Sequence, residues 1–541
     1  MLDKIAAHIN STSKILGIFI LIVIVGIFLR TYNFSDWLRF NADQARDASV
    51  ARTMVEEGVI PLLGPVAGGT DFRIGPISIY FQSLGAWIFG IAPDKMAYAD
   101  LLFGIMSVPL IFLFLREYFS VKAALASTAL YAVSFFAVQY SRFAWNSNSA
   151  QFFVVLLLYA IIRTAYGNGG KKFLWAAVSG IAFGVAVQLH TLLLFSVPLF
   201  FVIIGVHLVR HKKINIAHIV VIVAVAAALN APQLINEVRT GQANATAFFS
   251  ALIKKSPKQS SLGGNILHVA ACQVQANAKI LLPQNDQEKC GFPFAEGNLK
   301  KIIKKDAGLI VWIAYGVGSL FAAAFSLAGY YLVTRRAFRE KDGKKRIFFA
   351  VIFAYCVSLL LVSFPFGREI SLRYFILTAF VPYLFVALLV EWSMAKTKPA
   401  VAWSFVGAVF FYNLYFCAQV FNAYAGNSGN MIDGSMPQAK SMAEYLMESS
   451  APHRSFQVGG KNTDLGRFVD RTSYFVNGAG MSIIELDDQK NVDPELPFFV
   501  AVSGMSKKCQ IAASYKDYGE IEGCKQIEDV TILKIRTEKN N

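Results

Sequence analysis

Long apolar runs separated by short polar turns dominate the first 420 residues of this 541-residue chain. A helix that crosses the hydrocarbon core of a bilayer needs about 20 mostly apolar residues. Eleven runs come close to that length: 13–30, 98–115, 122–140, 147–166, 173–189, 191–209, 215–233, 307–333, 347–364, 373–391 and 400–420. The pattern predicts a polytopic α-helical membrane protein with about eleven transmembrane helices.

A twelfth apolar run, Gly75–Ile91, is short and begins with a Gly-Pro pair. If this run lies along the membrane interface and the N-terminus is cytoplasmic, the cytoplasmic loops hold 19 basic residues and the short outer loops hold 9. If the run crossed the membrane, the seven basic residues of 335–346 would face outward. Because cytoplasmic loops carry the excess of Lys and Arg, we predict interfacial helices in the first outer loop, 31–97.

Composition and charge narrow the classes of function. Charged residues make up 16% of the chain, against roughly 25% in soluble domains, and a 14% share of aromatic residues excludes a disordered chain. The net charge of +16 is uneven, because residues 1–420 hold 38 basic and 19 acidic residues and residues 421–541 hold 13 and 16. The excess of basic residues lies within the apolar part of the chain, where it indicates membrane topology. We therefore expect no nucleic-acid partner.

The predicted topology leaves two sizeable outward segments besides the first outer loop. Residues 1–420 form the membrane domain, with a long outer loop at 234–306, and residues 421–541 form a small extracytoplasmic α/β domain. Turn residues such as Asn477-Gly478 separate the elements of this small domain. We predict a helix near Gln438–Glu448 and strands at Phe456–Val458, Ser473–Val476, Phe498–Val502 and Val530–Ile535.

The six cysteines divide according to compartment. Cys356 and Cys417 fall in predicted spans, where cysteine is most simply a small buried apolar residue. Each soluble outward segment holds one pair, and the cytoplasmic loops hold none; the pairs are Cys272 with Cys290 and Cys509 with Cys524. This distribution is typical of an oxidising compartment, so we expect two disulfides. Free thiols are the alternative, and the spacings fit no zinc site.

Polar side chains gather at one mouth of the predicted bundle, on the outer side. Asp43 and Asp47 are four residues apart with Arg46 between them, so on a helix the two carboxylates share a face; Asp43 also fits a helix N-cap. The later outer turns hold Arg73, Arg142, Asn146, His190, Arg373 and Tyr374. A single arginine is more often a snorkelling anchor. Together, these groups favour the binding of a ligand that has an anionic head and a membrane-soluble tail, because arginine binds phosphate bidentately and stays charged when partly desolvated.

An ordered set of motifs resembles the bacterial branch of the protein O-mannosyltransferase-like family, within the glycosyltransferase-C superfamily. The motifs are Asp-Gln-Ala-Arg-Asp at 43–47, Gly75-Pro76 with Tyr80, Ser-Arg-Phe-Ala-Trp-Asn at 141–146, and Arg373-Tyr374 followed by Pro382. The lipid A aminoarabinose transferases are similar in architecture. The resemblance covers about residues 30–395 and does not reach the tail. It implies a glycosyltransferase-C fold for the membrane domain.

The resemblance also implies an activity. Enzymes of this kind transfer a sugar from a polyprenyl-phosphate-linked donor to an acceptor hydroxyl on the extracytoplasmic face, and direct displacement at the anomeric carbon predicts inversion. By this likeness Asp43 is the base, and the ligands of the donor phosphate are Arg73, Arg142, His190 and Arg373. The supporting residues are Arg46, Asp47, Asn146 and Tyr374. The partners are then the donor, membrane lipid and an acceptor glycan, lipid or protein.

Two departures from the family pattern bear on the site. Many relatives have an acidic pair where this chain has Asp43-Gln44, and many have arginine where it reads Tyr98-Ala99-Asp100. Gln44 removes the second adjacent carboxylate that would help to hold a metal, so we expect no metal and no other cofactor. The resemblance places the chain in the bacterial inner membrane, with a cytoplasmic N-terminus and a periplasmic or extracellular 421–541 domain.

Two other classes of protein stay open. A transporter or flippase of lipid-linked glycans keeps ionisable groups inside its spans, and the predicted spans hold almost none. A glycan ligase of another kind acts on a lipid-diphosphate donor. We favour the glycosyltransferase over both.

Overall fold

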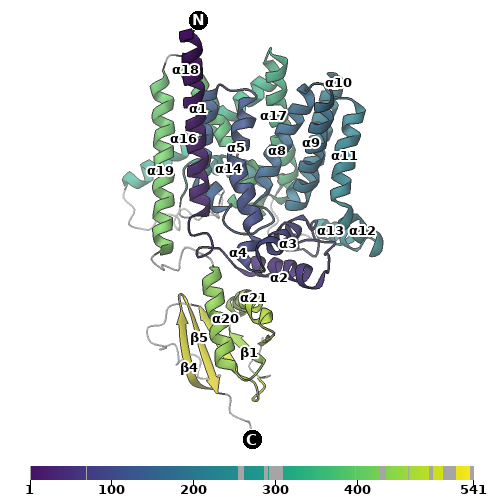
Figure 1. Cartoon of the computed structure of the whole chain (residues 1–541), viewed down its shortest axis with the longest axis vertical. Coiled ribbons are helices and arrows are strands. Elements are labelled where there is room, and N and C mark those ends of the chain that lie inside the picture. Colours follow the sequence, from purple (N-terminus) through teal and green to yellow (C-terminus); the bar gives the residue numbers. More distant parts are fainter. Residues whose placement is uncertain are drawn as a thin grey trace.

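The computed structural model describes residues 2–68, 70–253, 261–284, 290, 309–396, 398–425, 434–460, 462–486, 492–503 and 519–536. A bundle of long helices and a small α/β domain lie one after the other along the long axis of the molecule (Figure 1). The N-terminus lies at the free end of the bundle, and the C-terminus lies at the far end of the α/β domain.

Each of the eleven apolar runs coincides with helical structure. The helices are α1 (Leu2–Thr31), α5 (Tyr98–Arg116), α6 (Val121–Val133) with α7 (Phe135–Gln139), α8 (Ala150–Tyr166), α9 (Gly170–Leu189), α10 (Thr191–Arg210), α11 (Ile216–Leu229) with α12 (Ala231–Arg239), α16 (Leu309–Arg339), α17 (Gly343–Ser363), α18 (Val381–Ala395) and α19 (Pro399–Ala425). Within the described residues, six helical segments are long and apolar enough to cross a membrane, or eight if two bent pairs are counted as single spans. The chain is therefore a multi-pass membrane protein, and the number eleven stays a prediction.

The turns that the charge pattern assigned to the cytoplasm meet at one end of the bundle. The nearly buried carboxylate of Glu117, which follows α5, forms ion pairs with Nη1 of Arg163 at 3.1 Å and with Nζ of Lys344 at 2.9 Å. Lys172 donates a hydrogen bond to the carbonyl of Lys213. Because α5 starts beside α4 (Pro93–Met96) near the α/β domain, this basic end lies away from that domain (Figure 1).

Short helices lie between the bundle and the α/β domain. They are α2 (Ala42–Glu57), α3 (Ile77–Phe89), α4, α12 and α13 (Ala243–Ile253), and Figure 1 shows them at the level where the two parts meet. α3 corresponds to the ambiguous run 75–91 and has 13 residues, about 20 Å of helix, which is too short to cross the hydrocarbon core. Its exposed side chains include Leu84, Trp87 and Phe89, as expected for a helix at a membrane interface.

The long loop 234–306 differs from a simple outer loop. Its helix α14 (Leu262–Leu281) packs against α16 and α18, and Cys272, Ala276 and Asn277 on it are fully buried. The carbonyls at its C-terminal end accept hydrogen bonds from bundle side chains, including Leu281 from Asn413 at 2.7 Å. A helix end buried in a bundle needs such donors, so the described part of the loop contributes to the core of the membrane domain.

The C-terminal domain is a five-stranded mixed sheet covered by two helices, α20 (Met436–Ser450) and α21 (Asn462–Gly478). The strand order is β2 (Ser482–Leu486), β1 (Ser455–Gly460), β3 (Phe498–Ser503), β5 (Val530–Arg536) and β4 (Glu520–Ile527). The pairs β1–β2 and β1–β3 are parallel, and β3–β5 and β4–β5 are antiparallel. On β3, Phe499 and Ala501 join the core under the helices, and Phe498, Val500 and Val502 form a second cluster on the other face.

One predicted strand is wrong. Residues 473–476 are the last turn of α21, not a strand. Tyr474 and Val476 share the core with Leu465 and Phe468 from the preceding turns, so the apolar positions follow the period of a helix. A short apolar run does not by itself distinguish a strand from a buried helix segment. The predicted helix near 438–448 and the strands near 456–458, 498–502 and 530–535 all lie within observed elements.

Candidate active site

The first part of the candidate site is the N-terminal turn of α2. Asn41 precedes the helix, and its backbone N–H donates a 3.2 Å hydrogen bond to Oε1 of the nearly buried Gln44. A Gln or Glu three residues after a helix N-cap satisfies one of the free donors at the helix start. Gln44 thus caps the helix without adding a charge. Asp43 lies in this first turn.

Arg46 joins the two aspartates of α2. Its Nη1 lies 2.9 Å from Oδ1 of Asp43, while its Nη2 and Nε lie 2.8 Å and 2.9 Å from Oδ1 of Asp47. The side chain of Asp47 is only 4% exposed, whereas that of Asp43 is 54% exposed. Asp47 therefore anchors the guanidinium, and Asp43 presents a carboxylate that a substrate can reach.

Burial also sets the protonation of Asp47. Desolvation raises its pKa to about 6, although the positive charge of Arg46 opposes that rise and Arg73 contributes in the same sense as Arg46. The negative charge of Asp43 adds to the increase. Asp47 is therefore ionised at neutral pH and becomes protonated in mildly acidic solution, which would weaken its hold on Arg46.

Arg73 is held in place through its backbone. Asn244 of α13, which is nearly buried, accepts a 2.8 Å hydrogen bond from the N–H of Arg73 and donates one of 3.1 Å to its carbonyl. The side chain of Arg73 is exposed, and its Nη1 lies 3.4 Å from the carbonyl of Gly64. Asn244 was not a sequence candidate, because a lone asparagine in a loop carries no recognisable signal.

A second group of side chains surrounds His190, the residue between α9 and α10. Its Nδ1 accepts a 3.1 Å hydrogen bond from the N–H of Leu192 and so caps α10. Burial, assisted by the positive charge of Arg373, lowers the pKa of His190 to about 4. The ring is therefore neutral at physiological pH, and Nε2 carries its proton and is a hydrogen-bond donor.

Aromatic side chains frame Arg373 beside this histidine. The ring centroids of His190 and Tyr374 are 5.2 Å apart in an edge-to-face arrangement. The guanidinium carbon of Arg373 lies 5.8 Å from the ring centroids of both Trp145 and Tyr374. Arg373 is exposed. Nδ2 of Asn146 donates a 2.7 Å hydrogen bond to the carbonyl of Leu189, which ties the turn that carries Trp145 to the end of α9.

Asp100 positions that turn, and the sequence interpretation missed this role. Its carboxylate accepts a hydrogen bond from the hydroxyl of Ser149 and one of 3.2 Å from the N–H of Trp145. Asp100 is nearly buried on α5. Its carboxylate thus organises the segment from Trp145 to Ser149.

Gln188 brings the loop of Arg73 close to the turn of His190. Its Oε1 accepts a 3.3 Å hydrogen bond from the N–H of Ile77. A Cβ atom at Gly75 would lie 2.4 Å from Cγ of Gln188, so only glycine allows this approach. The two residues that touch here, Gly75 and Gln188, are each two positions from Arg73 and His190 in the sequence. The two groups of side chains therefore lie at the same end of the bundle.

Arg142 does not join either group. Its guanidinium donates hydrogen bonds to the carbonyls at the end of α1 and just after it, with distances of 3.2, 3.0, 2.8 and 3.3 Å to Leu29, Arg30, Tyr32 and Asn33. It is nearly buried and lies over the rings of Phe34, Trp37 and Phe421. The C-terminal carbonyls of a helix are a favourable place for a cation. Arg142 therefore caps α1 in this structure, and its role as a phosphate ligand stays a prediction that these contacts do not support.

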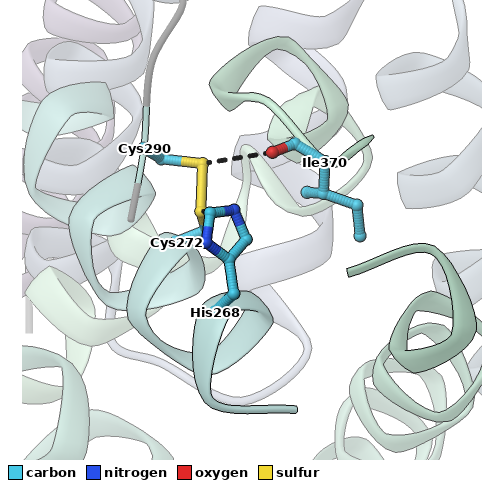
Figure 2. The surroundings of a disulfide bond; sticks show 4 residues. All are labelled: His268, Cys272, Cys290 and Ile370. Carbon is cyan, nitrogen blue, oxygen red and sulfur yellow. Dashed lines mark hydrogen bonds between the residues drawn. A yellow bond between two sulfur atoms is a disulfide. The ribbon is translucent and has the colours of Figure 1, made fainter. Parts of the chain in front are cut away.

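A disulfide lies beside the segment that precedes Arg373. Cys272 of α14 is bonded to Cys290, and Sγ of Cys290 contacts the carbonyl of Ile370 at 3.6 Å (Figure 2). Nε2 of His268 lies 3.4 Å from Sγ of Cys272. These three side chains have the chemistry of metal ligands, but the two sulfurs are bonded to each other and are not thiolates. Cys524 is also in a disulfide, whereas Cys509 lies outside the described residues.

The comparisons with known proteins agree with this architecture. Residues 74–235 match the family model described as Dolichyl-phosphate-mannose-protein mannosyltransferase. The fold is similar to that of ArnT from Cupriavidus metallidurans in the apo state, with a TM-score of 0.52, 12% identity and coverage of 97% of this chain and 98% of ArnT. The same protein bound to undecaprenyl phosphate gives a TM-score of 0.52 and 12% identity over 95% and 97%.

No curated protein sequence matches the chain significantly. The family match covers the segment that holds Gly75, Arg142 and His190, and the structural match extends over nearly the whole chain, including the C-terminal domain. The chain therefore has the glycosyltransferase-C fold of ArnT, and its residues 74–235 relate it to the dolichyl-phosphate-mannose-protein mannosyltransferases.

Proposed function

We propose that this protein transfers a sugar from a polyprenyl monophosphate carrier to an acceptor hydroxyl, with inversion at the anomeric carbon. The observation that carries the proposal is the pairing of two unlike groups at one end of the bundle. One group presents the accessible carboxylate of Asp43, held by Arg46. The other presents the exposed guanidinium of Arg373 beside the neutral His190.

The carboxylate group suits the acceptor. A hydroxyl is a weak nucleophile at neutral pH, and a positioned general base typically contributes 10²–10⁴-fold to the rate. Asp43 takes the hydroxyl proton as the oxygen attacks the anomeric carbon. Arg46 fixes the direction of the carboxylate, and the buried Asp47 fixes Arg46 in turn.

The arginine group suits the donor. As the bond from the anomeric carbon to the phosphate oxygen breaks, its electron pair passes to the phosphate, which gains negative charge. In the proposed reaction, Arg373, Arg73 and the Nε2–H of His190 stabilise that charge. Within the described part of the chain, neither Arg73 nor Arg373 forms an ion pair with a carboxylate. ArnT has been crystallised with undecaprenyl phosphate, and the shared fold supports a carrier of that class for this chain.

The proposed setting is the bacterial inner membrane, with the N-terminus in the cytoplasm and the C-terminal domain outside it. The support is the collection of basic turns at the end of the bundle away from that domain, around Glu117, Lys213 and Lys344. An excess of basic residues marks the cytoplasmic side of a membrane protein. In this orientation the candidate site opens on the extracytoplasmic face.

The test is transfer by the purified protein from synthetic polyprenyl phosphates that carry different sugars. The expected result is release of free polyprenyl phosphate from at least one monophosphate donor, with no release of polyprenyl diphosphate from the matched diphosphate donors. The variant Asp43→Asn should reduce transfer by about 10²–10⁴-fold, while Asp71→Asn, an exposed acid of the same loop, should leave it unchanged. Turnover of diphosphate donors alone would instead establish a ligase, and full activity of Asp43→Asn would remove Asp43 as the base.

A further inference from the structure

The C-terminal domain holds α2 at both ends. The segment just before α2 is hydrogen-bonded to the segment just before α20. The N–H of Phe40 donates to the carbonyl of Gly434 at 2.8 Å, and the N–H of Met436 donates to the carbonyl of Leu38 at 2.9 Å. Near the end of α2, Nη1 of Arg52 donates to the carbonyl of Tyr474 at 2.8 Å. These contacts fix both the position and the rotation of the helix that carries Asp43.

The contact of Arg52 with α21 is unusually close. Its guanidinium carbon lies 3.8 Å from the ring centroid of the buried Tyr474. A Cβ atom at Gly478 would lie 2.5 Å from Nη1 of Arg52, so a larger residue there would displace the guanidinium from its observed position. Between these contacts, Ala45, Ala48 and Ala51 of α2 share one hydrophobic core with α21. Small side chains on α2 allow the two helices to approach closely.

Packing of α21 on α2 also brings a third carboxylate toward the site. Asp470 lies one helical turn before Tyr474 on α21, and Arg46 lies about two turns before Arg52 on α2. The exposed Asp470 interacts electrostatically with both Arg46 and Asp43. Partial desolvation raises the pKa of Asp470, with Asp43 acting in the same sense and Arg46 opposing it.

We propose that the C-terminal domain is a working part of the active site, in which Arg52 is a positioning residue for α2 and Asp470 is a positioning residue whose charge acts on Arg46 and Asp43. The proposal rests on the proposed function. The guanidinium of Arg46 is shared by two carboxylates, Asp43 and Asp47, so it holds Asp43 less tightly than an ion pair with Asp43 alone would. Asp43 thus keeps its direction while remaining able to accept a proton.

The charges around Asp470 define the expected pH effect. The titratable groups that act on Asp470 are Asp43 and Arg46 of α2. Asp43 and Arg46 in turn act on Asp47, as does Arg73. The neighbour of Asp470 in the sequence, Arg471, donates a hydrogen bond to Gln438 on α20. Removing one negative charge from this group makes the remaining carboxylates easier to ionise. In Asp470→Asn, the acid limb of the profile of kcat/KM against pH should therefore move to lower pH by about half a unit.

The first experiment compares full-length wild-type protein with Asp470→Asn, Asp470→Glu and the control Glu444→Gln, an exposed ion-paired acid on α20. We expect kcat to fall about twofold in Asp470→Asn, since a less basic cluster is a weaker proton acceptor, with the KM for the donor unchanged. Asp470→Glu should restore both the acid limb and kcat. A profile for Asp470→Asn that superimposes on the wild type overturns the role of Asp470. The proposed function would still stand after such a result, provided that Asp43→Asn is inactive in the same assay.

The second experiment does not depend on transfer. Hydrogen exchange in residues 42–57 should become faster in Arg52→Leu and stay unchanged in Arg454→Leu, an exposed arginine of the same domain as Tyr474. A misplacement of about 1 Å can cost roughly 10²-fold in rate, so Arg52→Leu should also lower kcat by about 10- to 100-fold. If hydrogen exchange in α2 of Arg52→Leu is unchanged, Arg52 does not position α2, whatever the transfer activity of the variant.

Discussion

The two halves of the candidate site differ in the way that each holds its key charge. In the α2 half, Asp43, Arg46 and Asp47 form a chain of ion pairs that runs from an exposed carboxylate to a buried one. In the α9–α10 half, Arg373 has no carboxylate partner in the described residues and lies over Trp145 and Tyr374 instead. An arginine framed by aromatic rings keeps its full charge for an incoming anion, whereas a carboxylate tied to an arginine keeps its direction.

This difference assigns separate tasks to the two halves. Proton transfer requires a carboxylate whose direction is fixed. Stabilisation of a leaving phosphate requires uncompensated positive charge and hydrogen-bond donors that are already in place before reaction. The C-terminal domain contacts the first half, through α2, and the disulfide of Cys272 and Cys290 lies near the second, beside Ile370. Substitutions in the two halves should therefore have different kinetic signatures.

The largest effect expected in the second half comes from Arg373→Ala. Loss of the exposed guanidinium beside His190 should lower kcat by about 10²–10³-fold, because preorganised charges at a developing anion are worth several kcal/mol. Arg373→Lys should recover part of this loss, since lysine keeps the charge but not the planar fork. Transfer kinetics over a range of donor concentrations would measure both variants. Equal loss in the two would show that the geometry of arginine, not its charge, is required.

A smaller effect is expected at His190. The neutral ring contributes one N–H donor at Nε2 and caps α10 through Nδ1. His190→Phe should lower kcat by about tenfold, in line with the loss of one hydrogen bond to a charged group. His190→Gln, which keeps a side-chain donor, should lose less. Because the pKa of His190 is about 4, its ionisation should not contribute to the pH profile near pH 6.5. The profiles of the wild type and of His190→Gln should therefore have the same shape in that range.

The buried end of the ion-pair chain gives a prediction about stability. The pKa of Asp47 is about 6 in the folded protein against an ordinary value of 3.8, so the folded state binds the proton more tightly than the unfolded state. Stability contributed by protonated Asp47 is therefore lost as the pH rises from about 4 to about 6. The thermal midpoint of wild-type protein in detergent should fall relative to that of Asp47→Asn over this interval. Parallel curves for the two proteins would contradict the raised pKa.

Much of this fold follows directly from the sequence. The eleven apolar runs all coincide with helices, and the short run with Trp87 forms a helix that is too short to cross the hydrocarbon core. Two kinds of structure could not be read in this way. Residues 473–476 form part of a helix because their apolar side chains pack with the preceding turns, and the interior helix α14 resembles a loop because it carries small and polar residues such as Gln273 and Asn277. Only the tertiary contacts show what those residues bury.

The charged residues of the candidate site could be selected from the sequence, whereas their geometry could not. Asp43, Arg46, Asp47, Arg73, His190 and Arg373 could be selected because charged residues are conspicuous in a membrane protein. Their supports, Asn244 and Gln188, are uncharged residues whose roles depend on hydrogen bonds to distant backbone. Arg142 poses the opposite problem. A sequence cannot distinguish an arginine that faces a ligand from one that faces the carbonyls of a helix end.

The smallest effect on transfer is therefore expected at Arg142. Its four hydrogen bonds go to backbone carbonyls around the end of α1, and buried acceptors left without donors cost about 1–3 kcal/mol each. Arg142→Gln should lower the thermal midpoint clearly, yet the KM for the donor and the kcat of the folded fraction should change by less than about twofold. Arg373→Ala should show the reverse pattern, with a large loss of kcat and little change in the midpoint. If Arg142→Gln instead raised the KM without loss of stability, Arg142 would return to the phosphate-binding half of the site.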